Sequence, residues 1–449
     1  TPAFAGAVAL AGFVRDLAMA PDGAFYVVGL FEKTIDFDPG AGVDLQTAAG
    51  GVDSFVTRFA ADGSYLWTRT IGGALGFVGL TVAAVAPDGM LFLAGDYAGP
   101  VDLDPGAGTD IAPNAMPGFG GGFVAKWDPA GTLVAVVRFP GGPDAGSMQF
   151  NDMALGENGE ILSAGAIQGK VDLHLPLGDG TVTIPSGQID GFALSLGPDL
   201  RTLWGFEFPH VNFLDVSAGA AGSVWIAGQF DGVVDFDPST GTNIQTSAGE
   251  KDAILLHVGA SGEVLAATPA GGTGHDTLSS VSYAPDGSVY LLGSLSPGGF
   301  QIAGLAPSGT ANGSDLFFAR LGADGRPIWV DLLGGPSSEF PGHVLATEDG
   351  VLALGSAESP NVAFDRAGGL TWAGTTNAGF ITRRRADGSH VFTMGLGGAA
   401  YLVPLHVAMS ASSMVVAGIY NGTPDLDPGP GTASLPTAES AHWLARFQL

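Results

Sequence analysis

The chain has 449 residues, of which 46% are apolar and 13% charged, so a large hydrophobic core is expected and intrinsic disorder is disfavoured. The 44 acidic and 16 basic residues give a formal net charge of −28, which disfavours nucleic-acid partners and favours cations. The absence of cysteine excludes disulfides, thiolate catalysis and zinc–sulfur sites, and no apolar run reaches the roughly 18 residues of a transmembrane helix.

One turn between alternating apolar runs recurs along the whole chain. It reads Ala-Pro-Asp-Gly at residues 20–23, 86–89 and 284–287, and degenerate copies end at Gly159, Gly222, Gly350 and Ser413. The successive spacings are 66, 70, 63, 65, 63 and 63 residues, which places seven copies in register. Asp-Gly between such runs predicts a β-hairpin, because glycine accepts the positive φ that the turn needs.

Each repeat is predicted to hold four antiparallel strands, which in the first repeat cover residues 14–20, 24–31, 53–60 and 65–71. Four short strands per repeat are typical of a β-propeller blade. The seventh repeat lacks a fourth strand, and residues 3–12 stand where that strand would precede the first repeat. We therefore predict an all-β, closed seven-bladed β-propeller, a single domain over residues 1–449, whose N-terminal strand completes the last blade. The predicted blades are residues 13–73, 78–142, 148–209, 212–272, 277–335, 340–398, and 403–449 plus 3–12.

Three short segments resemble those of the bacterial β-propeller repeat proteins of the SBBP type. They are Val-Asp-Phe-Asp-Pro at residues 234–238, Ser-Phe-Val-Thr-Arg-Phe at 54–59, and Leu66-Trp67 followed by Gly72-Gly73. The resemblance covers nearly the whole chain, with departures in blades 3, 5 and 6 between the second and third strands. It implies a propeller fold and an extracellular or surface bacterial protein, and it implies no particular ligand.

Paired aspartates recur in the insertion between the second and third strands of four blades. The pairs are Asp36 and Asp38, Asp102 and Asp104, Asp235 and Asp237, and Asp425 and Asp427. Strand residues two apart point to the same side, and neighbouring carboxylates attract Ca²⁺, which prefers several oxygen ligands. The alternative is turn chemistry, in which the second aspartate caps a Pro-Gly turn. The strand order places these insertions, with the connections between blades, on one face of the propeller, here called the long-loop face.

A second set lies seven residues before each turn glycine, near the start of the innermost strand. Its members are Asp16, Val82, Asp152, Asp215, Ser280, His343 and His406. Equivalent positions in a ring approach the central channel at one depth, and two imidazoles with a carboxylate suit a divalent transition metal or acid–base chemistry. The alternative is a structural role, in which these groups bind water or pair between blades.

Tryptophan and arginine add two further expectations. Trp67, Trp204 and Trp329 share one position in the fourth strand, Trp127 and Trp443 share one in the third, and Trp225 lies in a second strand, so all six are predicted to be core. Trp372, in the insertion of blade 6, is the candidate for a partner contact. The basic run 383–385 is predicted to be a solvated strand edge rather than a phosphate site.

The sequence therefore favours a secreted or surface-displayed bacterial binding and scaffold propeller, stabilised by calcium, with a protein or glycan partner on the long-loop face. The periplasm is the alternative compartment. The competing hypothesis is a metal-dependent lyase or hydrolase that uses the Asp/His ring, and a third is a lectin-like sugar binder.

Overall fold

A computed structural model describes residues 2–112, 120–141, 147–173, 181–183, 189–307, 311, 313–359, 361–364, 371–373, 378–397 and 401–449. The chain divides into two compact units, each described by itself. One unit comprises residues 1–8, 213–407 and 415–449, and the other comprises residues 9–212 and 408–414.

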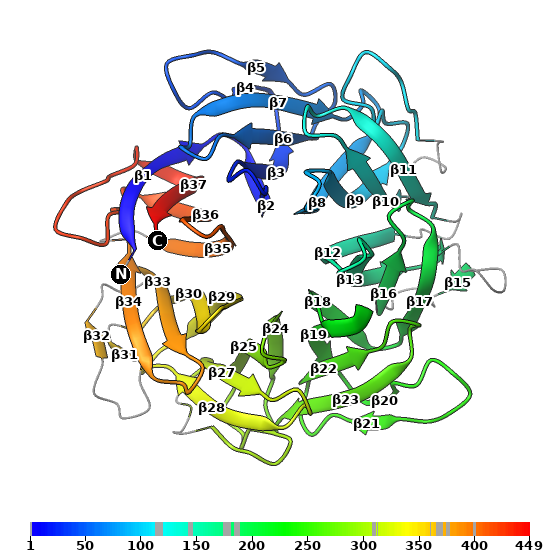
Figure 1. The fold of residues 1–449 in the computed structure, drawn as a ribbon, viewed down its shortest axis with the longest axis vertical. Helices are drawn as coiled ribbons and strands as arrows, with labels where there is room; N and C mark the ends of the chain where they lie inside the picture. The colour runs from blue at the N-terminus through cyan, green and yellow to red at the C-terminus, as the bar shows by residue number, and fades with distance from the viewer. Residues whose placement is uncertain are drawn as a thin grey trace. The chain divides into compact units, whose positions relative to one another are not determined.

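In the described residues, seven antiparallel sheets are the blades of a seven-bladed β-propeller, and each blade contributes four strands of its own (Figure 1). Blade 1 contains β2 (Phe13–Met19), β3 (Phe25–Phe31), β6 (Asp53–Phe59) and β7 (Tyr65–Ile71). Blade 2 contains β8 (Phe77–Val85), β9 (Leu91–Ala98), β10 (Gly120–Trp127) and β11 (Leu133–Phe139). Blade 3 contains β12 (Ser147–Leu155), β13 (Ile161–Gln168), β16 (Asp190–Leu196) and β17 (Thr202–Phe208). In blade 1 these bounds agree with the predicted strands to within one residue.

Blades 4 to 6 follow the same order. Blade 4 contains β18 (Val211–Ala218), β19 (Val224–Phe230), β22 (Asp252–Val258) and β23 (Val264–Gly271). Blade 5 contains β24 (Thr277–Tyr283), β25 (Val289–Leu295), β27 (Asp315–Leu321) and β28 (Pro327–Leu333). Blade 6 contains β29 (Glu339–Thr347), β30 (Gly350–Ala357), β33 (Ala378–Arg385) and β34 (His390–Leu396). The described residues contain one helical turn, η1 (Ala220–Gly222), and no helix of a length and hydrophobicity that could span a membrane.

The seventh blade confirms the predicted role of the N-terminus. Its sheet order is β1-β37-β36-β35, in which β1 (Ala3–Leu10) lies beside β37 (Ala438–Gln448), followed by β36 (Ser413–Gly422) and β35 (Leu402–Met409). The rings of Phe4 and Phe447 meet edge to face across the β1–β37 pair, with centroids 5.8 Å apart. The first strand of the chain therefore completes the last blade (Figure 1).

Two tight turns per blade follow the glycine signal. The first turn places Gly23 at φ 81° and Gly287 at φ 85°, and the second places Gly63 at φ 86° and Gly388 at φ 85°. The aspartate before each glycine also caps the turn: Asp22 Oδ1, for example, accepts the Ala24 N–H at 3.0 Å. Positive φ strains residues with a Cβ, which explains why glycine recurs there.

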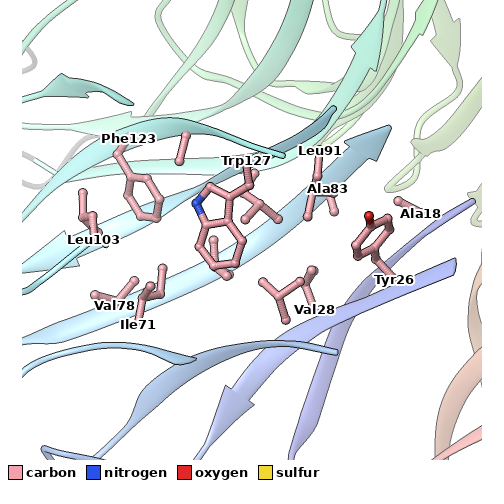
Figure 2. Close-up of a cluster of buried hydrophobic side chains, with 14 of the residues drawn as sticks. Ala18, Tyr26, Val28, Ile71, Val78, Ala83, Leu91, Leu103, Phe123 and Trp127 are labelled. Atoms are coloured by element: carbon pink, nitrogen blue, oxygen red, sulfur yellow. The ribbon is translucent and has the colours of Figure 1, made fainter. Parts of the chain in front are cut away.

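The core lies between the faces of neighbouring blades. One cluster joins Tyr26 and Val28 of β3 to Val78 of β8 and to Phe123 and Trp127 of β10, all buried (Figure 2). Second strands such as β3 are buried on both faces, so they read as continuous apolar runs instead of alternating ones. This packing holds blade 1 against blade 2.

Candidate functional site

The aspartate pairs form a repeated hydrogen-bonded turn in the insertion. In blade 1 the insertion is a small hairpin of β4 (Thr34–Asp36) and β5 (Leu45–Thr47). Asp36 Oδ1 accepts the N–H groups of Asp38 at 3.2 Å and Asp44 at 2.8 Å, and Asp38 Oδ1 accepts the Gly40 N–H at 2.7 Å. The first carboxylate thus closes the loop, and the second caps its Pro-Gly turn.

The other three pairs repeat this geometry. Asp102 Oδ1 accepts the N–H groups of Asp104 and Asp110, Asp235 Oδ1 those of Asp237 and Asn243, and Asp425 Oδ1 those of Asp427 and Ala433, at 2.6–3.2 Å. In the third pair, hydrogen bonds from Ser239 hold the pKa of Asp237 below its usual value. The capped turn, which is the alternative to calcium binding, is therefore present in all four pairs. Calcium binding by these pairs stays a prediction.

Packing explains why glycine stands four residues after the second aspartate of each pair. A Cβ built on Gly42 would stand 2.1 Å from Asp38 Oδ2, and the same overlap occurs at Gly108, Gly241 and Gly431 with their own aspartates. Any side chain there would displace the carboxylate. The spacing Asp-x-x-x-Gly in these insertions is thus explained by one carboxylate lying against a bare Cα.

Insertions also fasten one blade to the one before it. Asp102 forms a β-bridge with Gly72, and Asp425 forms one with Gly397, with N–H···O distances of 2.8–2.9 Å. In blade 5, β26 (Gln301–Ile302) adds as a fifth strand to the outer edge of β23. These insertions are therefore partly braces on the outer strand of the preceding blade.

A hollow of about 610 Å³ adjoins the aspartate pair of blade 7. Its lining includes Asp425 and Asp427, Phe4 from β1, and Met394 and Leu396 from the edge strand β34. Carboxylates, apolar side chains and a strand edge thus face one space.

The polar side chains of the innermost strands accept hydrogen bonds from the next blade. Asp16 Oδ2 accepts the Ala83 N–H at 2.8 Å, Asp215 Oδ2 the Val281 N–H at 2.9 Å, and Ser280 Oγ the Val344 N–H at 3.1 Å. Each donor belongs to the residue after the equivalent position in the following blade. A β-bulge precedes Asp16 and Ser280 in their strands and re-aims those side chains. The alternative of pairing between blades is therefore realised at these three positions.

Replacing Asp215, which is 4% exposed, with alanine is expected to lower the free energy of unfolding by about 1–3 kcal/mol, because the buried Val281 N–H loses its acceptor. Asp215→Asn keeps an oxygen acceptor and should retain most of the stability. Urea unfolding of the three proteins measures both differences. Equal stability of the alanine variant and the parent would show that the hydrogen bond between the blades contributes nothing.

The two histidines of this set are less buried than Asp215 and Ser280. His343 Nδ1 lies 3.4 Å from Ser280 Oγ, and both histidines are partly exposed. Asp215, Ser280, His343 and His406 belong to one compact unit, whereas Asp16 and Asp152 belong to the other. Within the described parts of the chain, no group of three histidine, aspartate or glutamate side chains is arranged to hold a metal ion.

The tryptophans largely follow their predicted roles. Trp127, Trp204, Trp225, Trp329 and Trp443 are buried, and Trp67 is half-buried against the core between blades 1 and 2. The backbone of Trp372 lies in β32 (Thr371–Ala373), paired with Val362 of β31 (Asn361–Ala363), and its side chain is outside the described residues. Its predicted partner contact therefore stays a prediction.

The expectation that residues 383–385 form a solvated edge is wrong for Arg384. Arg384 is 1% exposed, pairs with the buried carboxylate of Asp331, and donates to the Phe364 carbonyl oxygen at 2.9 Å. Its guanidinium also lies over the rings of Phe318 and Trp329. The residues equivalent to Arg384 in the third strands of blades 1 and 5, Phe59 and Leu321, are buried in the core. The run of three arginines hid this equivalence in the sequence.

A second arrangement of arginine was not predicted from the sequence. Arg58 pairs with Asp22 in the first turn of its own blade at 2.8 Å, and it donates to the Pro129 carbonyl oxygen of the next blade at 2.8 Å. Arg320 repeats the arrangement with Asp286 and the Ala386 carbonyl oxygen. The recurring arginine before the last residue of the third strand is the signal that could have identified this brace.

Comparison with protein families finds no match, so the SBBP-type resemblance stays a prediction. Regulatory protein FlaEY of Caulobacter vibrioides is 29% identical over 210 residues, which are 45% of this chain and 22% of that protein. The chain thus spans about a fifth of the length of this curated relative.

Solved structures similar to the chain include propellers of several kinds. The β-propeller domain of the Trilobed protease from Pyrococcus furiosus shares 10% identity at a TM-score of 0.45, over 92% of this chain and 90% of that one. An ulvanlyase of polysaccharide lyase family PL25 shares 9% identity at a TM-score of 0.44, over 93% and 92%. The Dos1 propeller shares 8% at 0.43, over 99% and 94%. Propellers host unrelated activities, so no function follows from these likenesses.

Proposed function

We propose that the chain is a binding and scaffold propeller. The observation that supports this is the use of Asp16, Asp215 and Ser280 as acceptors for backbone N–H groups of the next blade. A catalytic group must be within reach of a substrate atom, whereas these oxygens already hold the blades together. Three of the polar ring positions are thereby used to hold neighbouring blades together.

The partner binds at the insertions of the long-loop face. The hollow beside Asp425 and Asp427 joins two carboxylates to the apolar side chains of Phe4 and Met394, and the edge of β34 offers backbone hydrogen-bonding groups. Such a surface suits a protein or glycan partner that carries cationic or hydroxyl groups, and the net charge of −28 favours cationic ones. An extracellular or surface location, with the periplasm as the alternative, is part of this proposal and rests on the SBBP-type resemblance.

Calcium stabilises the insertions in this proposal. The first aspartate of each pair uses Oδ1 for two backbone N–H groups, and among the described residues Oδ2 of Asp36 and of Asp425 accepts no hydrogen bond. A carboxylate oxygen left over beside a second carboxylate is a suitable ligand for Ca²⁺. The hairpin is complete without the ion, so calcium adds stability to a formed loop.

Thermal unfolding of EDTA-treated protein with and without millimolar Ca²⁺ tests the calcium proposal, since an ion that binds the folded state raises the midpoint by mass action. We expect a rise, reduced by Asp425→Asn, which keeps the Oδ1 acceptor but removes the charge. Glu250→Gln, an exposed carboxylate outside the pairs, is the matched control.

Elemental analysis of untreated protein supplies the opposing outcome. No midpoint shift and no bound calcium would reduce the pairs to turn chemistry. A stoichiometric transition metal, lost on changing His343 or His406 to alanine, would instead support the metal-dependent enzyme and overturn the scaffold proposal.

A further inference from the structure

Two carboxyl groups are buried against each other where blade 5 meets blade 6. Asp315 begins β27 and is 1% exposed, and Glu339 begins β29 and is fully buried. The Glu339 N–H donates to the Ser314 carbonyl oxygen at 2.8 Å, which ties the start of β29 to the residue before β27. Both carboxyls therefore lie at a joint between blades, away from the aspartate pairs of the insertions.

The hydrogen bonds around Glu339 leave one of its oxygens for a proton. Oε2 accepts the Gly335 N–H at 3.2 Å, and the Ser359 hydroxyl and the Asp315 carboxyl also form hydrogen bonds with the Glu339 side chain. Within the described structure, no donor group reaches Oε1. Two carboxyl groups form a hydrogen bond only when one of them is protonated, so this contact calls for a proton between them.

The equivalent joint between blades 4 and 5 is built differently. Asp276 occupies the position of Glu339, and Asp252 that of Asp315. Asp252 accepts the N–H groups of Ala248 and Gly249, and Asp276 those of Gly272 and Ser296, at 2.8–3.3 Å. Burial raises the pKa of Asp276, and these backbone donors oppose the rise. Each carboxylate there has two donors of its own.

We propose that Glu339 and Asp315 share one proton and form a pH-sensitive latch, which holds β27 and β29 together until the proton is lost. Asp315 is the titratable group that faces Glu339 from β27, and Ser359 contributes an uncharged hydroxyl from the segment after β30. Burial, together with the hydrogen bond to Asp315 and its charge, raises the pKa of Glu339 to about 7.

The direction of the pH dependence follows from that raised pKa. In the opened state Glu339 returns to its ordinary value of 4.5, so the closed joint binds the extra proton between pH 4.5 and about 7. The contribution of the latch is complete below pH 4.5 and is lost as the pH rises through about 7. From pH 5.5 to 7.5 the opening constant of the joint should rise on the order of twentyfold.

Amide hydrogen exchange of the whole chain at pH 5.5 and 7.5, corrected for intrinsic exchange rates, measures this opening in β27 and β29. The parent should show the rise. Glu339→Gln should abolish it, because the amide imitates the protonated acid and can donate to Asp315. Asp276→Asn, at the equivalent joint, should keep it.

Asp315→Asn provides a second route should Glu339→Gln fail to fold. The side-chain amide introduced by this substitution would donate to an ionised Glu339, so the variant should also lose the pH dependence. A parent whose opening changes less than about twofold, or a folded Glu339→Gln or Asp315→Asn that keeps the parent's rise, overturns the latch.

Discussion

Arg384→Ala is expected to lower the free energy of unfolding by about 3–5 kcal/mol, because it leaves the buried carboxylate of Asp331 without its partner. The loss extends beyond the ion pair. Arg384 also donates to the Phe364 carbonyl oxygen, and its guanidinium lies 5.2 Å from the centre of the Phe318 ring. Equilibrium unfolding in urea, followed by tryptophan fluorescence and circular dichroism, measures the difference.

Arg383 is a matched control on the same strand. Its ion pair with Asp349 lies at an exposed turn, where such pairs contribute about 0–1 kcal/mol, so Arg383→Ala should change little. The double variant Arg384→Met with Asp331→Leu should recover much of the loss, because it removes both charges from the core. Equal effects of the two alanine variants would contradict a structural role for Arg384.

The fold could be predicted because its signals are local. Each turn needs glycine at positive φ between two apolar runs, and Gly23 and Gly287 mark such turns by residue type alone. The missing last strand and the surplus first one then predicted that β1 completes blade 7. Because the turn recurs seven times, an irregular copy, such as the one that ends at Ser413, can still be placed by its spacing from the others.

The role of the candidate residues depends on neighbours that the sequence does not show. The ring position of Asp16 and Ser280 was predicted from the repeat, but their partners are backbone N–H groups of another blade, about 65 residues away. Arg384 shows the converse error, because its charge suggested solvent while the equivalent residues of other blades, Phe59 and Leu321, are buried. In a repeat protein, the position within the repeat is the better guide.

The largest expected effect after Arg384 belongs to the N-terminal strand. Deleting residues 1–10 removes β1, leaves β37 as an open edge strand and uncovers Phe447. The strand pairing contributes about 1 kcal/mol per hydrogen bond, and buried apolar side chains add to it, so we expect a loss on the order of 5 kcal/mol. An uncovered strand edge also promotes association, so aggregation should increase with protein concentration.

A peptide of residues 1–12, added to the truncated protein, tests whether the missing pairing is the cause. The peptide should raise the melting temperature in proportion to its occupancy, and the same peptide with Val8→Pro, which removes an N–H group from the strand, should do so less. Removing only Thr1 and Pro2, which precede β1, should leave stability unchanged. A truncated protein that melts with the full chain would mean that three strands suffice for blade 7. Rescue by the parent peptide would show that the pairing of β1 with β37 stabilises blade 7.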